Sequence, residues 1–395
     1  MQEKTQKKIH LATVGVFLAL IFGFSIAFLL TPDRDFSEQE NRSLRTLPKL
    51  TFERLASGDY SSDINDYFAD QFPLRDPLVG WKGSVEIALG KGENDGILLG
   101  KDGYLARRLF DMKKSDGTTV PDMDAYDPAH VEGAIAGINR VAASIDLPFT
   151  VLLTGRTVDV AAEAFSYPSA YGDALLQQLR EGLEESGCYL DTVPAYRKRM
   201  AEGESVYYRT DHHWTTLGAY YAYADILRSF GMEADILPID AFERRTVSDD
   251  FYGTAWSAGG MKFVAPDSVE LWLYGNEADF SVIADGMELE GLYTMRHLEQ
   301  KDHYSVFLDG THDVVTVTKT TGEDRPTLVL FKDSFANAVA PFLAQHFDLV
   351  LLNLSSTRTD YTDVTRYAGE YGADHVLVIY TVENVVTASK MNRLR

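Results

Sequence analysis

The chain has 395 residues, of which 45% are hydrophobic and 24% are charged, a balance typical of a folded globular protein and unlike that of a disordered chain. Its formal net charge of -22 repels phosphate backbones and anionic lipid headgroups, which argues against nucleic acid as a partner. Cys188 is the single cysteine, so no intrachain disulfide can form.

An uncharged apolar segment covers residues 11–30. Its twenty residues would span about 30 Å as a helix, which is the thickness of a bilayer hydrocarbon core. Lys4, Lys7 and Lys8 precede it, and this positive cluster predicts that the N-terminus stays in the cytoplasm. A cleaved signal peptide is the alternative, but the exit sequence FLLTPD lacks the small-x-small pattern of a cleavage site. We therefore expect residues 1–32 to form a cytoplasmic N-terminus and a single-pass anchor in the cell membrane, with the body of the protein extracellular or periplasmic.

Residues 33–125 are expected to form a tether followed by a helical and hairpin region. The polar stretch 33–50 is typical of a tether. In residues 51–90, apolar side chains recur at helical spacing on both sides of Pro73, which breaks the helix. The segment 96–108, GILLGKDGYLARR, places apolar runs between glycine-containing turns and predicts a hairpin.

Residues 126–395 have the alternating pattern of an α/β domain. The predicted elements, in chain order, are helix 128–145, strand 149–155, helix 170–186, strand 188–190, helix 215–230, strand 327–331, helix 336–346, strand 347–354, helix 362–372 and strand 375–381. The long strands are continuous apolar runs of the kind buried on both faces of a parallel sheet. Residues 245–322 are rich in glycine, aromatic and β-branched residues, and we expect a β-rich insertion there.

Two polar motifs lie where chemistry is concentrated in α/β folds. Ser334, in the sequence KDSF, follows the predicted strand 327–331, and ligands of open α/β sheets bind outside the carboxyl ends of strands. The start of the next helix also offers free N–H groups to an oxyanion. The second motif, DHHW, contains Asp211 and His213, which share a face in an extended segment, whereas His212 would face away. Together these residues have the chemistry of a Ser-His-Asp triad.

Each motif also has a structural interpretation. An Asp-Ser pair before a helix is frequently only an N-cap, and a single histidine is more often structural than catalytic. His212 and His213 beside Asp211 suggest metal ligands, but adjacent histidines point apart and no Cys or Glu cluster completes a site. We therefore expect no metal, while the residues by themselves leave catalysis and structure open.

The motifs TDHHWT and KDSF, with DQFPLRD and DGILLGKDGYL upstream, resemble the DHHW family of bacterial envelope proteins. That family is similar to the alginate O-acetyltransferase proteins with an SGNH-hydrolase-like domain. The resemblance covers most of the chain after residue 35 and implies an SGNH-like parallel sheet flanked by helices for residues 126–395. It also implies catalytic roles for Asp211, His213 and Ser334, because in the alginate relatives an Asp-x-His-Trp segment likewise precedes the serine.

Three further residues are candidates for contacting the substrate or an oxyanion. Lys332 stands where SGNH enzymes usually have a glycine before Asp-Ser, so it departs from the pattern and brings a positive charge near the serine, with a surface lysine as the alternative. Arg156 follows the predicted strand 149–155 and is a candidate for a second wall of the site, with a solvated loop arginine as the alternative. Trp214 completes the DHHW motif.

The resemblance implies an O-acetyltransferase that acts on a cell-envelope polysaccharide or exopolysaccharide through an acetylated Ser334. An acetylesterase needs the same triad and differs only in using water as the acceptor, and a non-catalytic glycan-binding or scaffold subunit is the alternative outside enzymes. The expected partners are the polysaccharide acceptor and a membrane-bound O-acyltransferase that donates acetyl, with the bilayer contacted through residues 11–30. No cofactor is expected, since the chain has no Gly-rich phosphate loop suited to acetyl-CoA.

Overall fold

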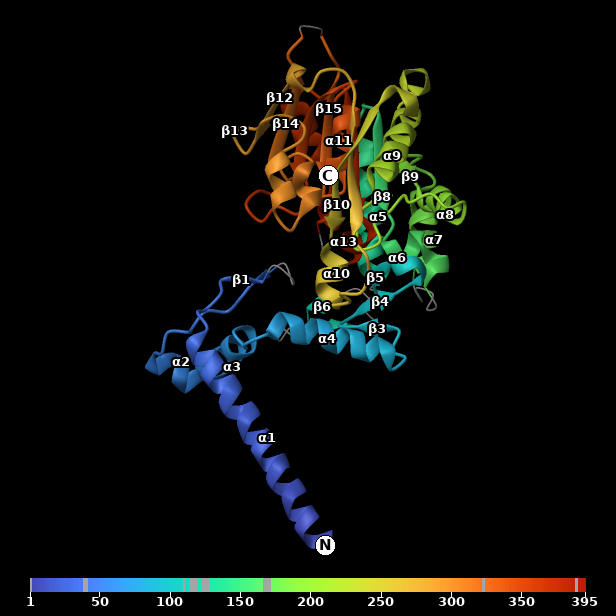
Figure 1. Ribbon diagram of the computed structural model, residues 1–395. Helices are drawn as coiled ribbons and strands as arrows, with labels where there is room; N and C mark the ends of the chain where they lie inside the picture. The colour runs from blue at the N-terminus through green and yellow to red at the C-terminus, as the bar shows by residue number, and fades with distance from the viewer. Residues whose placement is uncertain are drawn as a thin grey trace. The chain divides into compact units, whose positions relative to one another are not determined.

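The computed structural model describes residues 2–37, 42–108, 111–113, 119–121, 128–165, 172–321, 324–387 and 390–395. The chain divides into two compact units, which can be followed by colour in Figure 1. Unit 1 comprises Met1–Leu89 with Gly260–Lys262, and unit 2 comprises Gly90–Gly259 with Phe263–Arg395.

Unit 1 consists of a long N-terminal helix and three short helices. Its elements are α1 (Gln2–Leu30), β1 (Phe36–Ser37), β2 (Arg42–Ser43), α2 (Phe52–Ser57), α3 (Asp59–Asp70) and α4 (Arg75–Ala88). Helix α1 contains the apolar segment 11–30 and is, within the described residues, the one helix long and apolar enough to cross a membrane. Pro73 lies between α3 and α4, where the sequence predicts a break, because proline lacks the N–H that would continue the helix.

Unit 2 contains the remaining elements. The first strands are β3 (Glu93–Asn94), β4 (Ile97–Leu99), β5 (Leu105–Arg107), β6 (Asp111–Lys113) and β7 (Thr119–Pro121). The helices are α5 (Pro128–Ser144), α6 (Thr157–Val160), α7 (Gly172–Leu183), α8 (Val193–Ala201), α9 (Thr216–Ser229), α10 (Thr254–Gly259), α11 (Ala336–Leu343), α12 (Val364–Glu370) and α13 (Val382–Thr387). The later strands are β8 (Phe149–Thr154), β9 (Tyr189–Leu190), β10 (Glu243–Phe251), β11 (Asp267–Leu273), β12 (Phe280–Ala284), β13 (Met287–Glu288), β14 (Val314–Lys319), β15 (Thr327–Lys332), β16 (Asp348–Asn353) and β17 (His375–Thr381).

The hairpin of β4 and β5 belongs to unit 2, so this unit begins at Gly90 and not near the expected residue 126. The physical reason is a small hydrophobic core in which Leu98 and Tyr104 of the hairpin region pack with Val158 and Phe165. Burial of these side chains holds the hairpin against α6 and the residues that follow it.

An eight-stranded mixed sheet in the order β13-β12-β14-β16-β15-β17-β8-β9 forms the centre of unit 2. Strands β16, β15, β17, β8 and β9 pair in parallel, which confirms the α/β fold with a parallel sheet flanked by helices. The β-rich region 245–322 is not a single insertion. Its first part forms a separate antiparallel ribbon of β10 and β11, whereas β12, β13 and β14 extend the main sheet in antiparallel pairing.

Helices cover both faces of this sheet (Figure 1). Leu328 and Leu330 of β15 pack in one hydrophobic core with α9 and α11, whereas Val329 and Phe331 pack in a second core with α5, α7 and α12. This alternation explains why β15 is a continuous apolar run, since a strand covered on both faces has no solvent-facing positions. Polar side chains can then emerge only beyond the ends of the strands.

Candidate active site

The ends of three neighbouring parallel strands, β8, β17 and β15, meet at one edge of the sheet. The segments that follow these strands line a pocket with a volume of about 250 Å³. The pocket is completed by β5, the DHHW motif and the start of α10, and its lining residues are Leu105, Ala106, Arg107, Arg156, Thr157, Val158, His212, Thr254, Ala255, Asp333, Ser334, Phe335, Thr381, Glu383 and Asn384. It therefore lies where open α/β sheets bind their ligands.

His213 connects Asp211 to Ser334 through two hydrogen bonds. Nδ1 of His213 lies 2.5 Å from Oδ1 of Asp211, and Nε2 lies 2.8 Å from Oγ of Ser334. Because an ionised carboxylate can only accept, Nδ1 carries the proton, and Nε2 is left to accept the Ser334 hydroxyl proton. Asp211 and His213 are buried, whereas Ser334 is partly exposed to the pocket. This is the hydrogen-bond order of a serine acyl-transfer triad.

The DHHW motif reaches this geometry through a turn and not through the extended conformation that the sequence suggested. Oδ1 of Asp211 also accepts the backbone N–H of His213 at 3.0 Å, so one carboxylate oxygen fixes both the backbone and the ring of His213. Oδ2 accepts the backbone N–H and the hydroxyl of Thr254. Burial by itself would raise the pKa of Asp211, but His212, His213 and these hydrogen bonds hold that pKa well below its usual range. The carboxylate therefore stays charged.

His212 lines the same pocket as Ser334, which corrects the expectation that it faces away. Its ring centroid is 3.9 Å from that of His213, and Nδ1 is 2.7 Å from Oγ1 of Thr254. Because the Thr254 hydroxyl donates its one proton to Asp211, it must accept a proton from Nδ1 of His212. The other ring nitrogen, Nε2, is then left with a free lone pair.

Asp333 holds the turn that presents Ser334. Its Oδ1 accepts the backbone N–H of Phe335 at 3.1 Å, and its Oδ2 accepts the backbone N–H of Thr381 and the Nδ2 of Asn384. Desolvation raises the pKa of Asp333 in spite of these bonds. The backbone N–H of Ser334 has no acceptor among the described residues, so it can donate to an oxyanion next to the nucleophile.

Tyr304 connects His213 to the turn that carries Ser334. Its ring stacks on the His213 ring with a centroid distance of 3.8 Å and an interplanar angle of 8°. Its hydroxyl donates to the carbonyl oxygens of Ser334 and Phe335, at 3.2 and 3.3 Å. One side chain thus fixes the plane of the imidazole and the position of the serine backbone.

Two of the predicted substrate contacts do not line the pocket. Lys332 is buried, donates from Nζ to Oδ1 of Asn337, and has its pKa lowered by desolvation to about 8. As the last residue of β15 it shares the face of Leu330 and points into the core beneath α11, so it does not reach an oxyanion. Trp214 is also buried, and its Nε1 donates to the carbonyl oxygen of Phe335. Both residues are thus buried next to the turn that carries Ser334, where they stabilise the site without lining the pocket.

Arg156 does line the pocket, at the place expected from its position after β8. Its Nε and Nη2 each lie 2.8 Å from the carboxylate of Asp159, and the side chain is only 8% exposed. Arg156 therefore forms part of the pocket wall, where its ion pair with Asp159 holds it, and it is not a solvated loop arginine.

Within the described residues, one cluster brings metal-ligating atoms close together, namely Asp211, His212 and His213. Their ligand atoms lie within 4.8 Å of one another. An ion here would have to replace the hydrogen bond between His213 and Asp211, and Oδ2 of Asp211 is already held by Thr254. The observed hydrogen bonds are those of an acid–base pair, so the arrangement favours the triad interpretation of these residues.

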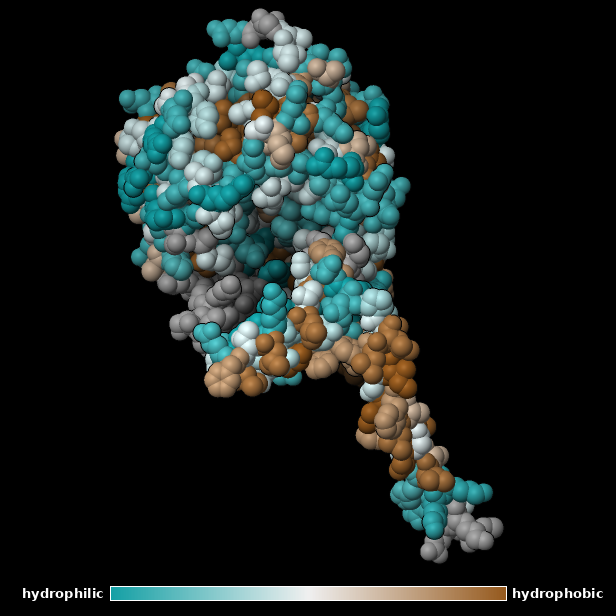
Figure 2. Space-filling view, turned by 90° about the vertical axis from the view of Figure 1, so that its left-hand side faces the viewer, coloured by the Kyte–Doolittle hydropathy of each residue, from teal (hydrophilic) through white to brown (hydrophobic). Residues whose placement is uncertain are grey.

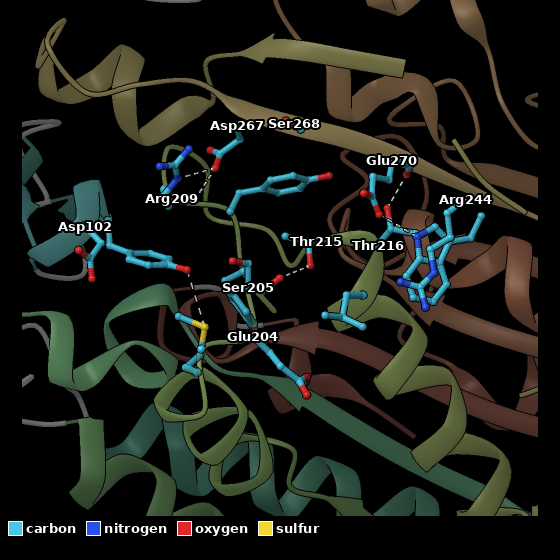
Figure 3. A pocket seen from close by; sticks show the side chains of 17 residues that line it. Asp102, Glu204, Ser205, Arg209, Thr215, Thr216, Arg244, Asp267, Ser268 and Glu270 are labelled. Carbon is cyan, nitrogen blue, oxygen red and sulfur yellow. Dashed lines mark hydrogen bonds and ion pairs between the residues drawn. The ribbon is translucent and has the colours of Figure 1, made fainter. Parts of the chain in front are cut away.

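A larger cavity of about 640 Å³ is lined by residues that flank the DHHW motif in sequence (Figure 3). Figure 3 shows Arg209 paired with Asp267 at one side, and Glu270 near Thr216 and Arg244 at the other. The triad side chains are not among its lining residues. This cavity bears on the triad because Asp267, one of its lining residues, fixes the two residues just before Asp211.

Asp267 accepts four hydrogen bonds from two consecutive residues. Oδ1 accepts from the backbone N–H and Nε of Arg209, and Oδ2 accepts from the backbone N–H and hydroxyl of Thr210. Since all four partners are donors, the site is built for a carboxylate with no proton of its own.

We expect Asp267→Asn to lower the free energy of unfolding by about 1–3 kcal/mol, because the amide would point an N–H at a donor and leave that donor unpaired. The shift of Thr210 would also move Asp211 away from His213 and is expected to lower any rate of ester hydrolysis at this site. Thermal unfolding and ester hydrolysis measure the two effects. The control is Ser268→Ala, which removes only an exposed hydrogen bond to Asp249. Unchanged stability and activity in Asp267→Asn would contradict this role.

Sequence reasoning missed Thr254, Asp267, Tyr304 and Asn384 as parts of the site. None of them belongs to a local motif, and each reaches the triad only through the packing of distant segments. Asp333 was visible in KDSF, but its part in fixing the turn depends on Thr381, the last residue of β17, and on Asn384 in α13.

Three comparisons place the chain among known proteins. Residues 184–353, which include Asp211, His213 and Ser334, match the DHHW protein family. No curated protein sequence matches the chain. The structure of PatB1 from Bacillus cereus matches with a TM-score of 0.59 and 17% identity, covering 76% of this chain and 99% of that one. A second PatB1 structure, with a sulfonyl adduct, matches with a TM-score of 0.58 and 16% identity over the same shares.

A DHHW family protein from Eubacterium siraeum matches with a TM-score of 0.53 and 18% identity, covering 75% of this chain and 97% of that protein. The O-acetyltransferase domain of Pseudomonas putida AlgJ matches with a TM-score of 0.45 and 14% identity, covering 74% and 92%. At these identities the structures above a TM-score of 0.5 show a shared fold. The family match over 184–353 and the DHHW neighbour confirm the resemblance of this chain to the DHHW family.

Proposed function

We propose that the protein is an O-acetyltransferase of a cell-envelope polysaccharide or exopolysaccharide, with Ser334 as the nucleophile. The observation that carries this proposal is the continuous hydrogen-bond chain from Asp211 through His213 to Ser334. It is supported by the backbone N–H of Ser334, which has no acceptor in the part of the chain that the structure describes, and by a pocket open to a substrate. An N-cap serine would need none of these features.

In the first half-reaction, Nε2 of His213 takes the hydroxyl proton of Ser334 as Oγ attacks the carbonyl carbon of a bound acetyl ester or thioester. The developing oxyanion accepts a hydrogen bond from the Ser334 N–H. Asp211, charged and fixed by Thr254, stabilises the imidazolium. As the carbonyl re-forms, His213 gives its proton to the leaving group, and acetyl-Ser334 remains.

In the second half-reaction, a sugar hydroxyl takes the place of the leaving group. His213 removes its proton while its oxygen attacks the acetyl carbon, and the proton then returns to Ser334 Oγ as the ester to the enzyme breaks. His212 lines the same pocket with a free Nε2, and it is suited to accept a hydrogen bond from an incoming hydroxyl. Water in place of the sugar would make the same site an acetylesterase.

We further propose that α1 is a single-pass anchor and that the body lies outside the cytoplasm, as the lysines before residue 11 predict. Protease added to intact cells or spheroplasts is expected to digest the body. Moving the three lysines to the other end of α1 is expected to scramble the orientation, since the positive cluster sets it. A body that stays protected from protease in the native chain would refute this topology.

The proposed acetyl donor is a membrane-bound O-acyltransferase, because the acetyl-CoA pool lies on the opposite side of the bilayer and a net charge of -22 opposes binding of the CoA phosphates. The test measures acetylation of the envelope polymer in cells that lack the candidate acyltransferase and in cells that carry Ser334→Ala. We expect the polymer to lose acetyl in both strains.

The other outcomes distinguish the alternatives. A rise in polymer acetyl with Ser334→Ala would identify an esterase and overturn the transferase proposal. Unchanged acetyl with Ser334→Ala, but loss of acetyl when the whole protein is deleted, would identify a non-catalytic scaffold.

A further inference from the structure

Helix α4 and the residues that cap it carry large apolar side chains that are exposed in the part of the chain that the structure describes. Leu78 and Trp81 lie in α4, whereas Leu74 is its N-cap residue and Leu89 its C-cap residue. At about 100° per residue, Leu78, Trp81 and Leu89 fall within about 80° of the helix circumference. Four large apolar side chains thus follow one another here, in the order Leu74, Leu78, Trp81 and Leu89. They are 65%, 40%, 68% and 79% exposed. On the opposite face of α4, by contrast, Gly80 and Gly83 are buried. A stripe of large apolar side chains at helical spacing, left in solvent, marks an interaction surface.

Other parts of unit 1 also expose large apolar side chains. Phe52 and Leu55 of α2 are 87% and 57% exposed, and Leu50 just before α2 is 66% exposed. Helix α3 contributes Phe68, which is also exposed. Figure 2 shows apolar surface along α1 and on the part of unit 1 that adjoins it, with hydrophilic residues at the free end of the helix.

Helix α1 packs directly against the turn between α3 and α4. The Phe24 ring stacks on Phe72 with a centroid distance of 5.1 Å, and Phe28 contacts Phe68 at 5.2 Å. A groove between them has a volume of about 450 Å³ and is lined by Ala19, Leu20, Gly23, Phe24, Ala27 and Thr31 from α1 and its end, and by Pro73 and Leu74. The turn therefore lies beside the second half of the apolar segment of α1.

This contact fixes the depth of the turn relative to α1. Leu30 ends the apolar segment, and Phe24, on which Phe72 stacks, is six residues before it, which corresponds to about 9 Å along a helix. A hydrocarbon core is about 30 Å thick, so Phe72 lies at the depth of the outer half of any bilayer that residues 11–30 span. Leu74 is two residues further along the turn and lines the groove on the same segment of α1.

The charges next to the turn are paired. Arg34 lies 2.8 Å from Asp76, and Arg75 lies 3.8 Å from Asp70. Pairing charges of opposite sign lowers the free-energy cost of moving this region from water to a lipid surface. Trp81 is a residue type that favours the boundary between headgroups and hydrocarbon.

We infer that the turn at Pro73 and the apolar stripe of α4 insert into the outer leaflet of the membrane that α1 spans. The occupant of this surface is lipid, because the surface is continuous with α1 and lies at the depth of its apolar segment. Unit 1 is thus anchored at two places, one spanning the bilayer and one lying in its outer leaflet. The inference rests on the proposed anchor role of α1.

The experiment uses the full chain reconstituted in phosphatidylcholine vesicles, with Cys188→Ala as background because this cysteine is buried. Single nitroxide labels are placed by Leu74→Cys and Leu78→Cys. Val16→Cys in α1 is the membrane control, and Ser62→Cys, on the exposed polar face of α3, is the water control. The depth of each label in the bilayer is measured by comparing its collision rate with oxygen to its collision rate with a water-soluble nickel complex. We expect positions 74 and 78 to behave like 16, with 74 deeper than 78, and position 62 to behave as in water.

A second measurement needs no substitution in the stripe. Brominated acyl chains are expected to quench part of the tryptophan fluorescence of the native chain, and this part is expected to be absent in Trp81→Phe. Trp214 and Trp272 are buried in unit 2 and remain as unquenched controls.

The two proposals fail in different ways. Lipid exposure at position 16 with water exposure at 74 and 78, and no quenching of Trp81, would overturn the inference and leave the anchor intact. Water exposure at position 16 would overturn the anchor itself. Because the vesicles contain no other protein, lipid exposure of 74 and 78 would also exclude that the surface needs a protein partner.

Discussion

Ser334→Ala is expected to reduce acetyl transfer to oligosaccharides, and acetyl ester hydrolysis in their absence, by roughly 10⁴- to 10⁶-fold. The reason is that Oγ would form the covalent bond to acetyl, and among the described residues no other hydroxyl is held at Nε2 of His213. The fold is expected to remain, since the structural role of the hydroxyl is limited to this one hydrogen bond. The measurement is the initial rate with a chromogenic acetyl ester, alone and with candidate acceptors.

Ser186→Ala is the matched control, because Ser186 bonds the carbonyl oxygen of Leu183 and does not line the pocket. It is expected to keep full activity. A sulfonyl fluoride gives an independent readout, since such reagents modify activated hydroxyl groups. Mass spectrometry is expected to find the adduct on Ser334. Substantial activity in Ser334→Ala, or an adduct elsewhere, would make the nucleophile assignment wrong.

Much of the fold was predictable because the central strands have no exposed positions. β15, β16 and β17 are apolar runs buried on both faces, and such runs are recognisable without knowing their neighbours. The edge of the sheet was not predictable in the same way. β12 and β14 alternate between buried and exposed residues, so their pattern fits either a separate ribbon or an extension of the sheet, and only pairing with β16 decides.

The site was predictable to the extent that its residues belong to motifs. Asp211, His213 and Ser334 stand in DHHW and KDSF, and the structure brings them together. Lys332 stands in the same motif, but the direction of its side chain depends on which face of β15 it shares, so adjacency to the serine was misleading. Tyr304 could not be found from sequence, since its stacking on His213 depends on how a segment between β13 and β14 folds back over the triad.

His212 and His213 are adjacent in the sequence, but their side chains have different positions and therefore different expected roles. His213→Ala is expected to be about as damaging as Ser334→Ala, because a serine without its base is a weak nucleophile and triad members act as a unit. His212→Ala is expected to be much milder. His212 bonds Thr254 and lines the pocket, so its loss is expected to raise KM for the acceptor more than it lowers kcat.

Two experiments separate the role of His213 from that of His212. One is the Asp211→Asn variant, and the other compares ester hydrolysis with transfer to a sugar. The asparagine would present an N–H or a neutral oxygen to Nδ1 of His213 and disturb the tautomer, so the rate is expected to fall by roughly 10⁴-fold in both ester hydrolysis and transfer. His212→Ala, by contrast, is expected to affect transfer to a sugar and to leave simple ester hydrolysis nearly unchanged, because Nε2 of His212 would act only on the incoming hydroxyl. If His212→Ala abolished both reactions while His213→Ala retained them, the base would be the wrong histidine. If both variants lost activity and zinc restored it to the native chain after chelation, the cluster of Asp211, His212 and His213 would be a metal site and the acyl-enzyme mechanism would fail.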